Sequence, residues 1–186
     1  MTIVQEHIAD SFISLLKTHS YSAITIQMIC DNTPASRNAF YYYFRNKEKL
    51  VEWICFRDYM KYCFPYFQIK VDNIRTKSMF SCILKNKVFY TALSSVDGGH
   101  LLRDCLIKVY SSGLSEEKVN EYARPEQSSQ PKVSFEFFSR YLSAGAAAII
   151  MSWIESGMAI SVDDLVRDIA LIFSKSPDEI ITNYLF

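Results

Sequence analysis

Residues 24–50 read ITIQMICDNTPASRNAFYYYFRNKEKL and hold two short helical patterns separated by a break. Thr25 can cap the first helix, because its hydroxyl accepts from amides in the first turn, and Ile26 and Ile29 supply an inward face. Pro34 ends this helix, since proline lacks an amide donor and pushes the preceding residue out of the helical conformation. The pattern predicts two helices joined by a turn of three or four residues.

The second of these helices has two candidate starts. Either Thr33 caps it with Pro34 in its first turn, or Ser36 caps it. In both cases Phe40 and Phe44 fall on one side, where they can pack on a core. The other side carries Arg37, Asn38, Tyr41 and Tyr42. The helix is therefore expected to have one apolar and one polar face.

A helix, a tight turn and a second helix with a polar outer face form the geometry that places a recognition helix in the major groove of DNA. Arg37 can pair bidentately with guanine or a phosphate, and Asn38 offers the donor and acceptor that match adenine. The tyrosines at 41–43 can donate to phosphate oxygens, and Lys47 opens the next helix, where exposed amides also attract phosphate. These residue types predict a DNA-binding surface.

The same segment resembles the DNA-binding domain of TetR-family transcriptional regulators. The matching positions are Thr25-Ile26, Ile29, Thr33-Pro34-Ala35-Ser36-Arg37, Phe40-Tyr41-Tyr42-Tyr43-Phe44, Lys47 and Leu50. The chain departs from the family pattern at Thr33-Pro34, where Ala-Gly is usual, at Asn38, often Gly, and at Tyr43, commonly His. The candidate DNA-binding residues are Thr25, Ser36, Arg37, Asn38, Tyr41, Tyr42, Tyr43 and Lys47. For Tyr43 a position facing the domain interior is the alternative.

The remaining pattern is helical throughout, with no period-two run typical of a strand. A first helix is expected over residues 2–19 and a fourth from Asn46 to about Tyr62. Further helices are expected at 74–93, 100–112, 115–123, 132–157, 162–174 and 177–185. The prediction is an all-α chain, with a three-helix DNA-binding domain over 1–46 joined through the fourth helix to a helical regulatory and dimerisation domain over 47–186.

The segment 132–157 has small residues at 143–148 in mid-helix, which allow another helix to approach closely. Packing within one chain is one reading. The TetR resemblance implies the other, a homodimer interface built from 132–157 and 162–174, which would present two recognition helices to a palindromic operator. The region from Tyr141 to Gly157 also resembles regulators of dihydroxyacetone kinase. Aromatic residues after Tyr59 either form ordinary core or line a pocket for a small apolar or aromatic effector.

Several other functions are excluded or disfavoured by composition. The five cysteines include no CxxC pair and the three histidines lie far apart, so no metal site or cofactor is expected. No nucleophile, base and orienting group form a recognisable arrangement, and there is no glycine-rich phosphate loop, so an enzyme is not expected. No signal peptide or membrane span is visible, which predicts a cytoplasmic location.

Formal net charge is zero, but residues 36–49 hold an excess of three positive charges. The leading hypothesis is a sequence-specific DNA-binding regulator, most simply a repressor released by a small-molecule effector. The alternative is a TetR-like interaction protein or coactivator that acts mainly through a protein partner or ligand and binds DNA weakly. The zero net charge and Pro34 in the turn motivate that alternative.

Overall fold

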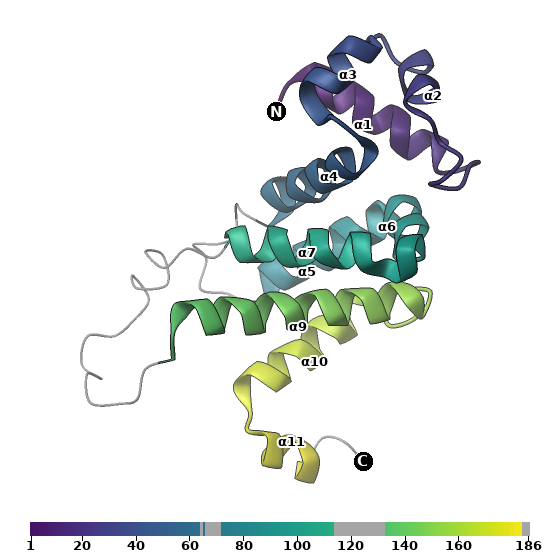
Figure 1. Cartoon of the computed structure of the whole chain (residues 1–186). Helices are drawn as coiled ribbons and strands as arrows, with labels where there is room; N and C mark the ends of the chain where they lie inside the picture. The colour runs from purple at the N-terminus through teal and green to yellow at the C-terminus, as the bar shows by residue number, and fades with distance from the viewer. Residues whose placement is uncertain (64, 66–71, 114–132, 184–186) are drawn as a thin grey trace.

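The structure, a computed structural model, describes residues 1–63, 65, 72–113 and 133–183, and these residues form helices and no strands (Figure 1). The N-terminal helices are α1 (Ile3–Leu15), α2 (Ile26–Asp31) and α3 (Arg37–Phe44), and α4 (Lys47–Tyr62) follows them. The C-terminal part contains α5 (Asp72–Lys85), α6 (Lys87–Ser94), a 3-10 turn η2 (Val96–Gly99), α7 (His100–Gly113), α9 (Phe135–Glu155), α10 (Val162–Ser174) and α11 (Pro177–Asn183). The predicted all-α fold is confirmed.

Helices α1 to α3 are called the head below. Each begins at a hydroxyl cap, and their apolar side chains pack together in one core. Thr2 and Gln5 make a reciprocal capping box at the start of α1. Ser36 caps α3 through the Ala39 amide, which settles the start that the sequence left open between Thr33 and Ser36. Phe40 and Phe44 are buried in one cluster with the apolar face of α1.

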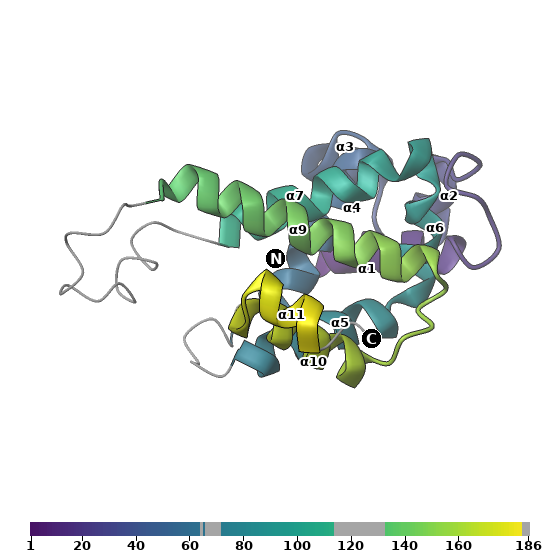
Figure 2. The ribbon, with the colours of Figure 1, turned by 90° about the horizontal axis from the view of Figure 1, so that it is seen from below.

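The head sits at one end of the molecule, and α4 connects it to the remaining helices (Figure 1). Helix α7 lies between α4 and α9, and it packs on both. The core here includes the edge-to-face pair of Phe80 and Trp153, whose ring centroids are 5.2 Å apart. Seen from below, α9, α10 and α11 lie on the side of the molecule opposite the head (Figure 2).

Helix α9 is the one element in the described ranges that is long and apolar enough to cross a membrane, a property it shares with core helices of soluble proteins. One of its faces packs on α6 and α7, where Ala147, Ile150 and Trp153 are buried. Its opposite face is exposed and carries Phe137, Tyr141, Ala144 and Ala148. Burial against α6 and α7 therefore accounts for the apolar residues of one face. The apolar residues of the opposite face stay exposed.

Two helix predictions were wrong in their bounds. The single helix expected over 74–93 is two helices, α5 and α6, with a break at Asn86. At the break the side-chain amide of Asn86 donates to Asp58 on α4 at 2.9 Å and does not cap α6. The first helix ends at Leu15 and not near His19, because residues 16–18 form a turn. The helix predicted at 115–123 lies outside the described residues.

Candidate DNA-binding surface

The turn between α2 and α3 spans residues 32–36, and each of the two helices begins at a hydroxyl cap. The Thr25 hydroxyl accepts from the Met28 amide at 3.2 Å, and the Ser36 hydroxyl accepts from the Ala39 amide at 3.2 Å. Ser11 of α1 donates to the Ile29 carbonyl at 2.7 Å, which ties α2 to α1. Capping thus fixes where α2 and α3 begin, and a buried contact to α1 anchors α2.

Thr25 and Ser36 are both exposed at the first turn of a helix. Each hydroxyl oxygen is used as a cap acceptor, so its proton remains to be donated outward. Free amides of the first turn point the same way, and the helix dipole favours an anion there. Both positions are therefore candidate phosphate contacts.

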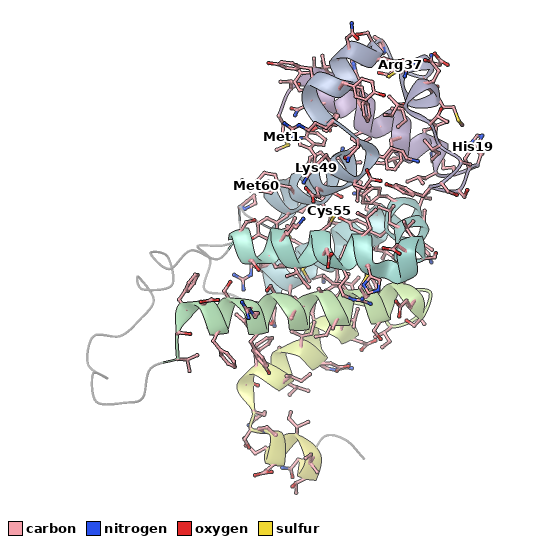
Figure 3. All side chains as sticks on the ribbon, viewed as in Figure 1. Met1, His19, Arg37, Lys49, Cys55 and Met60 are labelled. Carbon is pink, nitrogen blue, oxygen red and sulfur yellow. The ribbon has the colours of Figure 1, made fainter. Side chains whose placement is uncertain are left out.

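Helix α3 is amphipathic, with a buried apolar face and an exposed polar face. Phe40 and Phe44 are buried, whereas Tyr41 is 45% and Tyr42 83% exposed. Arg37 and Asn38 are exposed in the first turn, and in the described part of the chain neither side chain forms a hydrogen bond or salt bridge. Arg37 lies at the outer end of the head, remote from α9 and α10 (Figure 3). The structure therefore brings Arg37, Asn38 and the tyrosines onto one open surface.

The tyrosine triplet is divided between two environments. Tyr43 is half-buried and packs against the core, which is the alternative that the sequence left open for it. The Tyr42 ring stands edge-on to it with centroids 4.9 Å apart. Tyr43 therefore supports Tyr42, and Tyr41 and Tyr42 are the two hydroxyls placed to reach a backbone phosphate.

Lys47 is at the start of α4 as predicted, but its ammonium group turns inward. The Nζ atom donates to the carbonyls of Tyr21 and Ile24 at 2.8 and 2.6 Å, and it lies 4.5 Å from the centroid of the Tyr21 ring. Partial burial lowers the pKa of Lys47, against the opposing effect of Glu48. The lysine thus joins α4 to the loop before α2. Sequence reasoning missed this role because it depends on two backbone carbonyls that carry no sequence signal.

Arg45 is exposed at the C-terminal end of α3, and its backbone has a φ of 58°. A non-glycine residue in that region is uncommon and is imposed here by the tight passage from α3 to α4, where Asn46 already caps the next helix. In the sequence, Arg45 is one of the positive charges of residues 36–49 and carries no other signal. Its place between the exposed face of α3 and the start of α4 adds a cation at the edge of the candidate surface.

Two family profiles match this chain. The profile described as "Bacterial regulatory proteins, tetR family" matches residues 10–54, and a "Transcriptional regulator C-terminal region" profile of the same family matches residues 75–175. The chain belongs to the TetR family of transcriptional regulators. The first match contains the α2–turn–α3 unit of this TetR-family protein, and the second runs from α5 to α10.

Relatives agree with the predicted resemblance to regulators of dihydroxyacetone kinase. The HTH-type dhaKLM operon transcriptional activator DhaS of Lactococcus lactis subsp. lactis (strain IL1403) is 35% identical over 57 residues. That match covers 31% of this chain and 30% of DhaS, so the chain matches less than a third of that relative's length.

Solved structures share the fold at low identity. The dihydroxyacetone kinase operon activator DhaS superposes with a TM-score of 0.60 at 23% identity, covering 90% of this chain and 92% of that one. The fatty acid degradation regulator FadR from Bacillus halodurans gives 0.58 at 14%, covering 92% and 98%. The TetR-family repressor AlkX from Dietzia sp. strain DQ12-45-1b, implicated in biodegradation of n-alkanes, gives 0.53 at 16%, covering 91% and 92%. At these identities the likeness concerns the fold alone.

Proposed function

We propose that this TetR-family regulator recognises a specific DNA sequence through the exposed face of α3. The observation that carries the proposal is the open placement of Arg37, Asn38, Tyr41 and Tyr42 on one helix behind a capped turn. Arg37 and Asn38, with Ser36, read base edges, while Thr25, Tyr41 and Tyr42 hold the DNA backbone. Tyr43 acts through Tyr42, and Lys47 contributes by fixing the loop before α2.

We place the boundary between the DNA-binding domain (1–46) and the regulatory domain (47–186) at the start of α4. Asn46 ends the head and caps α4 through the Lys49 amide at 2.9 Å. From there α4 runs into contact with α5 and α7. A DNA-binding regulator acts in the compartment that holds the DNA, which favours a cytoplasmic location.

The regulator acts as a homodimer whose interface is the exposed face of α9 with the end of α10. Of the small residues in α9, Ser143 and Ala147 are buried within the chain, whereas Ala144, Gly145 and Ala148 face outward. A Cβ atom added at Gly145 would meet no atom within 4 Å. On α10, Ile172 and Phe173 are 58% and 68% exposed. In the dimer a second copy covers these apolar surfaces. The two-fold symmetry of the dimer matches an operator with two inverted half-sites, a palindrome.

The effector is a small molecule with an apolar or aromatic body. A groove of about 380 Å³ lies between α4 and α5. It is lined by Lys61, Tyr62, Ile74, Lys77, Ser78, Ser81, Cys82 and Lys85. The ammonium groups of Lys61 and Lys85 lie 5.4 and 6.0 Å from the Tyr62 ring centroid. A negative group on the effector would fit this lining.

Repression is the simplest mode of regulation, because a dimer bound over a promoter blocks transcription without contacting another protein. AlkX is named a repressor and DhaS an activator, so both modes occur on this fold. The alternative, a regulator that depends on a protein partner and binds DNA weakly, is favoured by the inward turn of Lys47, which removes a cation from the surface.

Replacing Arg37 or Tyr42 with alanine tests the proposed surface. Each change is expected to weaken binding to a duplex selected by the wild-type protein from a random pool, by about 10- to 100-fold for Arg37→Ala and less for Tyr42→Ala. Arg103→Ala, on α7, is the matched control and should bind as the wild type does. Gel-shift titration measures the affinities, and circular dichroism checks the fold. Equal affinities for all four proteins would remove the assignment of α3.

A further inference from the structure

A buried polar network is centred on two consecutive residues of α4, Arg57 and Asp58. They are only 8% and 3% exposed. The Arg57 guanidinium donates to Asp58 Oδ1 through Nε at 3.1 Å and Nη2 at 2.9 Å. Buried charges of this kind are retained only when they are paired and hydrogen-bonded, so each further partner is informative.

The partners of Asp58 come from the regulatory domain. Its Oδ2 atom accepts from the Asn86 amide at 2.9 Å and from the Tyr90 hydroxyl at 3.1 Å. Burial, and then the Asp58 charge, raise the pKa of Tyr90, so this hydroxyl stays a donor. Asn86 is the residue at which α5 stops and α6 begins, and its side chain does not cap α6. Asp58 therefore holds the α5–α6 break against α4.

The remaining partners of Arg57 come from the head. Its Nη1 atom donates to Glu6 Oε2 at 3.0 Å and lies 3.9 Å from Asp10 Oδ1, both on α1. Burial alone would lower the pKa of Arg57, but Asp58 and Glu6 outweigh it and raise the pKa. The guanidinium is thus permanently charged and is fixed at both ends. A continuous chain of polar contacts runs from α1 through α4 to the α5–α6 break.

We propose that Arg57 and Asp58 are positioning residues for DNA recognition, which set the orientation of the head relative to the α5–α6 break. The inference rests on the proposed function, in which α3 of each head binds one half of an operator. Because the network joins rigid groups through directional hydrogen bonds, a shift at Asn86 changes the position of α1 and, with it, of α3. The apolar contact of Phe12 with Phe89, whose centroids are 6.4 Å apart, also joins α1 to α6 but fixes no direction.

Asn86→Ala and Glu6→Gln perturb the network at its two ends: the first removes a donor to Asp58, and the second removes the charge that pairs with Arg57. Hydrogen–deuterium exchange of the free protein is the first measurement. Asn86→Ala is expected to raise exchange in α1 by about 5-fold or more while α9 stays as in the wild type. When Asn86→Ala is combined with Glu6→Gln, exchange in α1 should be no higher than in Glu6→Gln alone. Asn73→Ala, at an exposed position of α5, is the matched control.

The second measurement is operator spacing, which a general loss of stability would not alter. The wild type should bind its selected duplex much better than duplexes with one base pair inserted between the half-sites, and both variants should lose most of this discrimination. Tyr90→Phe, which removes a single hydroxyl, replaces Asn86→Ala if that variant does not fold. Unchanged α1 exchange in Asn86→Ala, or strictly additive effects with Glu6→Gln, would overturn the proposal. If the wild type selects no duplex, the proposed function fails, while the exchange data still decide the coupling.

Discussion

Asp58→Ala is expected to lower the free energy of unfolding by about 3–5 kcal/mol. The carboxylate accepts four hydrogen bonds, from Arg57 twice and from Asn86 and Tyr90 once each. Its removal leaves a guanidinium, an amide and a hydroxyl buried without their acceptor. Since a domain of this kind is stable by only about 5–15 kcal/mol, the loss is a large part of the total.

Urea unfolding followed by circular dichroism at one fixed protein concentration measures this loss, because the proposed dimer would make stability depend on concentration. Asp163→Ala is the control, since Asp163 forms an exposed ion pair with Lys77 and its side chain is 76% accessible. Exposed pairs contribute little, so the control should unfold close to the wild type. A midpoint for Asp58→Ala as near to the wild type as that of the control would show that the network does not stabilise the fold.

Ala148→Glu is expected to convert the homodimer into monomers and to lower affinity for the operator by about 100- to 10,000-fold. Ala148 is exposed in mid-α9 beside Gly145, so a glutamate there would place a charge in the proposed apolar interface of each subunit. Loss of the dimer separates two linked half-site contacts into two independent weak ones. Sedimentation velocity gives the oligomeric state, and gel shift gives the affinity.

Leu84→Glu provides the comparison, because Leu84 is an apolar residue on α5 that is 44% exposed and lies away from the proposed interface. It should sediment and bind DNA as the wild type does. Finding Ala148→Glu still dimeric, with wild-type affinity, would place the interface on another surface.

Local signals made most of the fold predictable. Thr25 and Asn46 begin helices at the predicted caps, Ser36 is one of the two caps that the sequence left open for α3, and Phe40 and Phe44 are core as their spacing indicates. These features depend on residues within one or two turns of each other. The two faces of α3 could be predicted for the same reason, since α3 is a single short helix with apolar residues on one side and polar residues on the other.

What the sequence did not predict depends on contacts between distant residues. At the break, the side-chain amide of Asn86 donates to Asp58, 28 positions earlier. Lys47 turns inward because the carbonyls of Tyr21 and Ile24 lie beside it after folding. The link of Arg57 to Glu6 spans 51 positions. None of these residues departs from ordinary helical patterning, so periodicity and capping could not reveal their partners.

The salt dependence of DNA binding, measured on the selected duplex and on a scrambled duplex of equal length, tests sequence-specific recognition through α3 most directly. Binding through several phosphate contacts predicts a linear fall of log K with log salt, with a slope of about −0.9 per contact. It also predicts a preference of about 1,000-fold or more for the selected sequence. A flat response with equal affinity for both duplexes would contradict DNA recognition and favour a regulator that works through a protein partner.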